Sequence, residues 1–187
     1  MLRKLGVAHL KVLLIYLTVV TILRWEFPHS FGAFFDLVGL WVGGVIGLGL
    51  LGLDRVLYVY VIRPHEQLSQ QIQEKVRTQH WKEALETLLA RRKEQYHLAF
   101  RNGIFALVYI PVVFFAVTSS SGLFGKGVAL GVMVHLLHDI WRDQLKNPSE
   151  LNSWLFWMVS RDVTLEEQKI FVWVLTAAFG MVSLILL

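Results

Sequence analysis

Five stretches of this 187-residue chain are too apolar for the surface of a water-soluble domain. Hydrophobic residues make up 55% of the sequence, and only 17% of the residues are charged. Apolar runs of about 18 residues or more are typical of transmembrane helices. The runs expected to cross a membrane are residues 10–23, 38–62, 104–117, 123–141 and 170–187. The first and third are short as purely apolar runs, but the flanking residues are of types that a membrane helix tolerates and can extend both. The sequence therefore predicts an all-α, polytopic membrane helix bundle with about five transmembrane helices.

The basic residues are distributed unevenly around these runs. Cytoplasmic loops of membrane proteins carry the excess of Lys and Arg. With the N-terminus in the cytoplasm, fifteen of the 18 Lys and Arg residues lie on the cytoplasmic side, whereas Arg24 and Lys126 lie outside and Arg55 lies within the membrane. No small-x-small cleavage pattern follows the first run, so we expect it to be retained as a helix. The predicted protein crosses the membrane several times and has a cytoplasmic N-terminus.

The predicted helices divide the chain into three parts. Residues 1–62 form transmembrane helices one and two, and residues 102–187 form helices three to five, with an interfacial segment at 147–164. A capping box formed by Thr164 and Glu167 is expected to open the last helix. Residues 63–101 form a basic, amphipathic cytoplasmic segment of two helices with a break near residues 78–80.

The central segment allows two interpretations. It lies on an anionic membrane leaflet, or it presents a solvated charged face. Its basic residues could also dock a protein partner. The net charge of +4 is explained by the basic residues on the cytoplasmic side of the membrane. Membrane lipids are therefore expected as partners, and nucleic acid is not.

Ionisable residues interrupt two of the apolar runs. Asp54 and Arg55 lie within residues 38–62, and His135, His138 and Asp139 lie within residues 123–141. A charge at the membrane centre costs roughly 2.5–3.5 kcal/mol on insertion scales, so such residues are rare and usually functional. A rise of about 1.5 Å per residue places both groups in the cytoplasmic half of the bilayer, where two facing helices could bring them together.

Glycines recur every four residues in the same two runs. They occupy positions 39, 43 and 47 in the first run and positions 127 and 131 in the second. Small residues at this spacing allow helix backbones to approach closely. We therefore expect these two helices to pack against each other.

The polar residues in these helices have the spacing of a metal site. His135 and Asp139 lie one turn apart on one helical face, and Asp54 could add a carboxylate from the facing helix. Because the chain has no cysteine, its ligands must be His, Asp or Glu, which suit zinc or manganese better than calcium. The hypothesis takes Asp54, His135 and Asp139 as ligands of a divalent metal, with His138 or His80 as general acid or base.

Other interpretations fit the same residues. Asp54 could pair with Arg55, and His135 could hydrogen-bond a carbonyl group, which would make the group a structural polar cluster. A proton or ion path is a third interpretation, although a complete path needs polar groups spread across the membrane. For the whole protein, the alternative to an enzyme is a non-catalytic membrane scaffold or accessory subunit that docks through residues 63–101.

Three short patches resemble small bacterial inner-membrane proteins described as membrane-bound metal-dependent hydrolases. Residues 52–55 are similar to the Leu-Pro-Asp-x-Asp-His motif of that family, keeping the second Asp and carrying Arg55 in place of His. Residues 77–80 are similar to its Arg-x-x-Thr-His-Ser motif, and residues 135–139 match its His-x-x-x-Asp helix. The resemblance implies a location in a bacterial inner (plasma) membrane. It also implies a metal-dependent hydrolase acting on a lipid-linked or phosphoester substrate at the cytoplasmic side.

Overall fold

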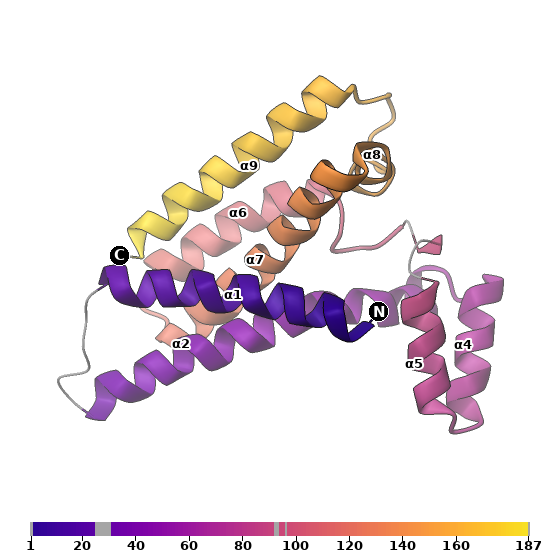
Figure 1. Cartoon of the computed structure of the whole chain (residues 1–187), viewed down its shortest axis with the longest axis horizontal. Coiled ribbons are helices and arrows are strands. Elements are labelled where there is room, and N and C mark those ends of the chain that lie inside the picture. Colours follow the sequence, from indigo (N-terminus) through magenta and orange to yellow (C-terminus); the bar gives the residue numbers. More distant parts are fainter. Residues whose placement is uncertain (1, 25–30, 92–93, 96, 187) are drawn as a thin grey trace.

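The computed structural model describes residues 2–24, 31–91, 94–95 and 97–186, and every regular element in these residues is helical (Figure 1). The all-α prediction is therefore confirmed. The α-helices are α1 (Leu2–Arg24), α2 (Phe31–Leu50), α3 (Asp54–Leu57), α4 (Gln67–Arg77), α5 (Trp81–Ala90), α6 (Gly103–Thr118), α7 (Leu123–Lys146), α8 (Pro148–Leu155) and α9 (Leu165–Ile185). A 3-10 turn, η1 (Leu51–Leu53), joins α2 to α3, and a π-helical turn, η2 (Tyr58–Ile62), follows α3.

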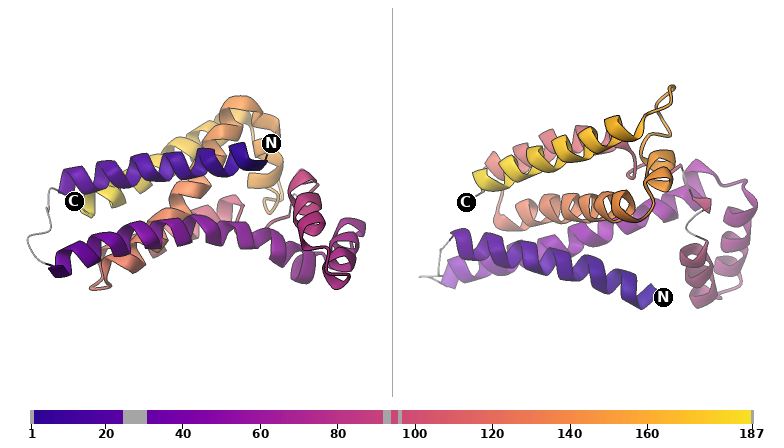
Figure 2. Two further views of the ribbon diagram at one scale, coloured as in Figure 1. Left: turned by 60° about the horizontal axis from the view of Figure 1, so that its bottom comes forward. Right: turned by 45° about the horizontal axis from the view of Figure 1, so that its top comes forward.

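Three stretches of helix are long and apolar enough to cross a membrane: Gly32–Ile62, Leu123–Lys146 and Leu165–Ile185. Shorter apolar helices cover Val7–Leu23 and Gly103–Thr118. Figure 2 shows that the helices containing these five stretches all extend along the long direction of the molecule. The chain is therefore a helical membrane protein.

Helix α7 is the central helix of the bundle. Within its most apolar window 67% of the residues are buried, against 28% for each of the other two long candidate spans. Its most extensive helix–helix contact is with α2. Gly43, Gly47, Gly127 and Gly131 all lie in that contact, where the backbone of the facing helix leaves no room for a side chain. The predicted glycine-mediated packing of these two helices is confirmed.

Helices α4 and α5 form a hairpin at one end of the bundle. Figure 1 shows that this hairpin extends across the long direction of α2 and away from the other helices. The predicted break lies at residues 78–80, where Gln79 has a φ of 62°. Leu68, Ile72, Ala84 and Leu88 are buried between the two helices and the start of η2. The prediction of two amphipathic helices in this segment is confirmed.

The capping box at the start of α9 gives a small, testable contribution to stability. The Thr164 side chain accepts a hydrogen bond from the Glu167 backbone N–H at 3.3 Å, and the Glu167 carboxylate accepts one from the Thr164 N–H at 2.9 Å. Thr164→Ala is expected to lower the free energy of unfolding by about 1 kcal/mol, because it leaves a helix N-terminal N–H without its acceptor. Detergent unfolding followed by circular dichroism measures this. The same loss in Ser160→Ala, in the exposed stretch before α9, would contradict a specific capping effect.

Candidate functional site

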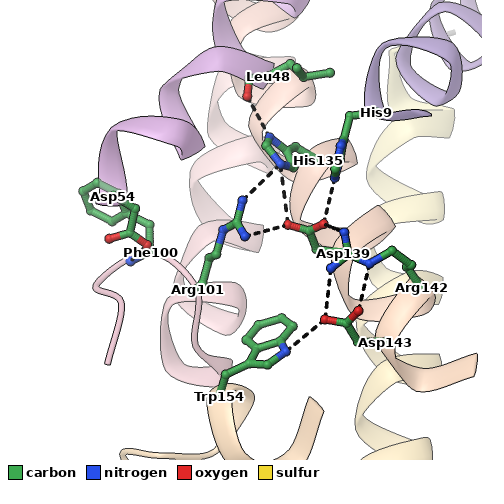
Figure 3. Close-up of polar contacts among 10 residues, drawn as sticks. All are labelled: His9, Leu48, Asp54, Phe100, Arg101, His135, Asp139, Arg142, Asp143 and Trp154. Atoms are coloured by element: carbon green, nitrogen blue, oxygen red, sulfur yellow. Dashed lines mark hydrogen bonds and ion pairs between the residues drawn. The ribbon is translucent and has the colours of Figure 1, made fainter. Parts of the chain in front are cut away.

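The ionisable residues of α7 converge on a single carboxylate. Asp139 is buried, with 1% of its surface exposed. Its Oδ1 atom accepts a hydrogen bond from His9 Nε2 at 2.7 Å and lies 2.8 Å from Arg142 Nη1. Its Oδ2 atom lies 3.0 Å from Arg101 Nη1 and 3.5 Å from His135 Nε2 (Figure 3). We call these five residues, together with His138, the Asp139 cluster.

Three separate parts of the chain supply this cluster. Positions 135, 139 and 142 are one turn apart in α7, so their side chains share one face of that helix. His9 comes from α1, 130 residues away from its partner in sequence. Arg101 lies two residues before the first residue of α6. The next residue, Asn102, is the N-cap of that helix, and its side chain accepts a hydrogen bond from the Phe105 N–H at 2.8 Å. The cluster therefore joins α1, α6 and α7 near one end of the bundle.

Neighbouring groups fix the orientation of His135. Its Nδ1 atom lies 2.7 Å from the carbonyl oxygen of Leu48 in α2. Because a carbonyl oxygen only accepts, Nδ1 is the protonated nitrogen and donates. In the neutral ring, Nε2 is then the acceptor, and it faces Arg101 Nη2 at 3.2 Å. The sequence-based alternative that His135 hydrogen-bonds a carbonyl group is confirmed.

A second carboxylate holds Arg142 in place. Asp143 Oδ1 accepts a hydrogen bond from Arg142 Nε at 2.8 Å, and Oδ2 accepts one from Nη2 at 3.1 Å. The indole N–H of Trp154 in α8 donates to the same Oδ2 at 3.2 Å. Because Asp143 fixes one edge of its guanidinium group, Arg142 points its Nη1 at Asp139.

Asp54 lies outside the Asp139 cluster. It is fully buried, and its two carboxylate oxygens accept the backbone N–H groups of Ala99 and Phe100, both at 2.9 Å. Figure 3 shows Arg101 between Asp54 and Asp139. These two hydrogen bonds attach the segment that precedes α6 to α3. The structure does not bring Asp54 together with the other predicted ligands.

One group of residues has the geometry to hold a metal ion. His9, His138 and Asp139 each offer one ligand atom, and these atoms lie within 4.8 Å of one another; no other such group occurs among the residues that the structure describes. The buried His138 Nδ1 atom of this group has no hydrogen-bond partner within the described part of the chain, whereas Asp139 Oδ2 is paired with Arg101. Buried polar atoms without partners are rare. His138 Nδ1 is therefore available to a bound ligand.

The predicted site residues have different positions in the structure. His135, His138 and Asp139 are together, whereas His80 is at the exposed connection between α4 and α5, with its Nδ1 atom 3.0 Å from the Thr78 hydroxyl. Figure 1 shows this connection far from α1 and α7. The sequence-based prediction gives no role to His9, which lies one residue before the first predicted run. The available signal was an ionisable residue next to an apolar run.

Comparison of the chain with protein-family models, with curated proteins and with solved structures finds no match. Its fold and its site therefore define it by class. It is a helical membrane protein with a buried cluster of His and Asp residues near one end of the bundle, and three of these residues are placed so that they could hold a metal ion.

Proposed function

We propose that this protein is a membrane-embedded, metal-dependent hydrolase, with His9, His138 and Asp139 as ligands of a zinc or manganese ion. The single observation that carries the proposal is the grouping of these three ligand atoms within 4.8 Å. The buried His138 Nδ1 atom, which has no hydrogen-bond partner among the described residues, supports it. Two His ligands and one carboxylate form a ligand set known from catalytic zinc sites, which leave one coordination position open.

The arginines of the cluster favour an anionic substrate. Arg101 and Arg142 place two guanidinium groups within 3.0 Å of the Asp139 carboxylate. Guanidinium groups pair well with phosphate oxygens, so a phosphoester or a lipid-linked phosphate suits this environment. When bound, a divalent metal would supply a water whose pKa is lowered to about 7. His135 accepts a hydrogen bond from Arg101 and so helps to orient this guanidinium group toward Asp139, and it is therefore a positioning residue in this proposal.

Metal binding by histidine variants tests the proposal. Wild-type protein purified from membranes, stripped with a chelator and reloaded with zinc is expected to hold one zinc ion per chain. His138→Ala is expected to lose that ion, because it removes a ligand. His135→Ala is the matched control, and is expected to retain zinc with an affinity reduced by about 10–100-fold, the effect of losing an outer hydrogen-bonding partner. Metal analysis and zinc titration measure both.

Two results would count against different parts of the proposal. Wild-type protein without stoichiometric metal, or a His138→Ala variant that binds zinc like the wild type, would remove the metal centre. Zinc- or manganese-loaded protein that releases no phosphate from phosphatidate in detergent micelles would retain the metal centre but remove phosphoester hydrolysis.

A second candidate function is a non-catalytic membrane scaffold or accessory subunit. The observation that favours it is the set of contacts that Asp139 already makes with residues from α1, from the entry of α6 and from α7. Such a cluster can fasten three helices together without any metal. In that case residues 63–101 would dock a protein partner, and wild-type protein would purify together with another chain and without metal.

A further inference from the structure

An apolar cavity of about 200 Å³ lies where the α4–α5 hairpin meets the membrane-spanning helix. One wall is made of Val56, Val59 and Tyr60, which belong to the last turns of the span Gly32–Ile62. The opposite wall comes from the hairpin and includes Trp81 and Leu85 of α5. The cavity therefore has one wall in the membrane-spanning segment and one wall outside it.

The rim of this cavity is apolar and open. Trp81 is 62% exposed and Leu85 is 56% exposed, and on the spanning helix Val56 and Tyr60 are 43% and 47% exposed. Large exposed apolar patches mark sites of interaction with proteins, membranes or ligands. Because the rim continues the apolar surface of a spanning helix, the lipid that surrounds that helix is also the nearest neighbour of the cavity.

The orientation of the hairpin agrees with a position on the membrane surface. Spanning helices lie close to the membrane normal, with tilts of roughly 20° on average. Figure 1 shows α4 and α5 extending across the direction of the spanning helices, which places the hairpin along the membrane plane. On α5, Trp81 and Leu85 share one face, whereas Glu86 lies about 100° further around the helix. Tryptophan is enriched at membrane interfaces.

We propose that this cavity binds an acyl chain of a phospholipid in the leaflet at the hairpin end of the bundle. The hairpin lies on that leaflet, and Trp81 and Leu85 enter the boundary between head groups and acyl chains. The lining of this cavity is almost wholly apolar, so the cavity holds water poorly and accepts apolar ligands instead. Amphipathic helices bury their apolar face about 5–10 Å into this boundary. The inference is independent of any metal at the Asp139 cluster.

Spin labels on the hairpin test its position. The chain contains no cysteine, so Leu85→Cys and Glu86→Cys each create one labelling site in the full-length protein. In phosphatidylcholine liposomes, the label at position 85 is expected to collide more often with oxygen, and less often with a water-soluble nickel complex, than the label at position 86. Glu86 is the matched control, because it is exposed on the same helix and faces another direction.

Two other outcomes of this experiment would overturn the proposal. Equally high nickel accessibility at the two positions would show that the hairpin is surrounded by water. A label at position 85 that is shielded from both oxygen and nickel would show that a protein surface covers the cavity, from a second copy of this chain or from another partner.

A cavity-filling variant tests the bound acyl chain itself. Ala84 lines the cavity, so Ala84→Trp is expected to fill it and to reduce the phospholipid retained by the purified protein by about one molecule per chain. Native mass spectrometry measures this number, with Glu86→Trp as the control of equal size. Unchanged lipid retention in Ala84→Trp would remove the acyl-chain site. If that variant does not fold, Val56→Trp on the exposed opposite wall of the cavity provides the same test, and unchanged lipid retention there would likewise remove the acyl-chain site.

Discussion

Asp139→Asn is expected to lower the free energy of unfolding by about 3–5 kcal/mol, the range typical of breaking a buried ion pair by removing one partner. The wild-type carboxylate is nearly inaccessible and faces two guanidinium groups within 3.0 Å. An amide of the same shape removes the negative charge but leaves Arg101 and Arg142 in place. Arg142 retains Asp143 as a partner. Arg101 retains its contact with His135 and the electrostatic attraction of Asp54, but loses its only direct ion pair among the described residues.

Unfolding by a denaturing detergent, followed by circular dichroism, measures this loss. The matched control is Asp162→Asn, which removes the same charge from an exposed position before α9 and is expected to change stability by no more than about 0.5 kcal/mol. Equal stabilities of the two variants would show that the Asp139 cluster does not hold α1, α6 and α7 together. That result would also remove the main support for the scaffold interpretation.

The elements that the sequence predicts well are those determined by local patterns. Apolar runs predict the spanning helices, the shift in helical periodicity predicts the break between α4 and α5, and Thr164 with Glu167 predicts the start of α9. The glycine spacing predicts a long-range contact, because a row of small residues on one helical face has few structural uses other than close packing.

The Asp139 cluster could be predicted only in part, because its partners are far apart in sequence. His9 and Arg101 contact Asp139 from α1 and from the entry of α6. Arg101 and Arg142 lie near helix ends, where membrane topology alone already accounts for basic residues. No local pattern distinguishes an arginine that marks the membrane surface from one that pairs with a buried carboxylate.

Asp54 shows why matched depth does not establish contact. Its depth along the helix follows from the rise per residue, but the direction of its side chain depends on every turn that precedes it. The 3-10 turn at Leu51–Leu53 has about 3.0 residues per turn instead of 3.6, which changes the rotation of the helix immediately before Asp54. The carboxylate therefore meets the backbone of Ala99 and Phe100.

The packing of α2 against α7 depends on glycines that cannot accept even one methyl group. A Cβ atom at Gly47 would lie within van der Waals overlap of the Val128 carbonyl oxygen and 3.0 Å from the backbone nitrogen of Val132. A Cβ at Gly131 would meet the carbonyl oxygen of Gly44 in the same way. Helices that approach this closely commonly make weak Cα–H contacts to the carbonyl oxygens of the facing helix.

Gly47→Ala is therefore expected to destabilise the protein by about 3 kcal/mol, at the upper end of the usual cost of overpacking, because the atoms that it meets are backbone and cannot rotate away. Gly49→Ala, two residues further along α2, is the matched control. A Cβ at Gly49 meets nothing within 4 Å, so this substitution is expected to stabilise the helix by roughly 0.5–1 kcal/mol through the higher helix propensity of alanine. The opposite signs of the two effects, measured by detergent unfolding, distinguish interface packing from helix propensity. If both alanines stabilise the protein, α2 and α7 do not pack at this distance in the membrane, and the contact from Leu48 to His135 that depends on their packing would be lost as well.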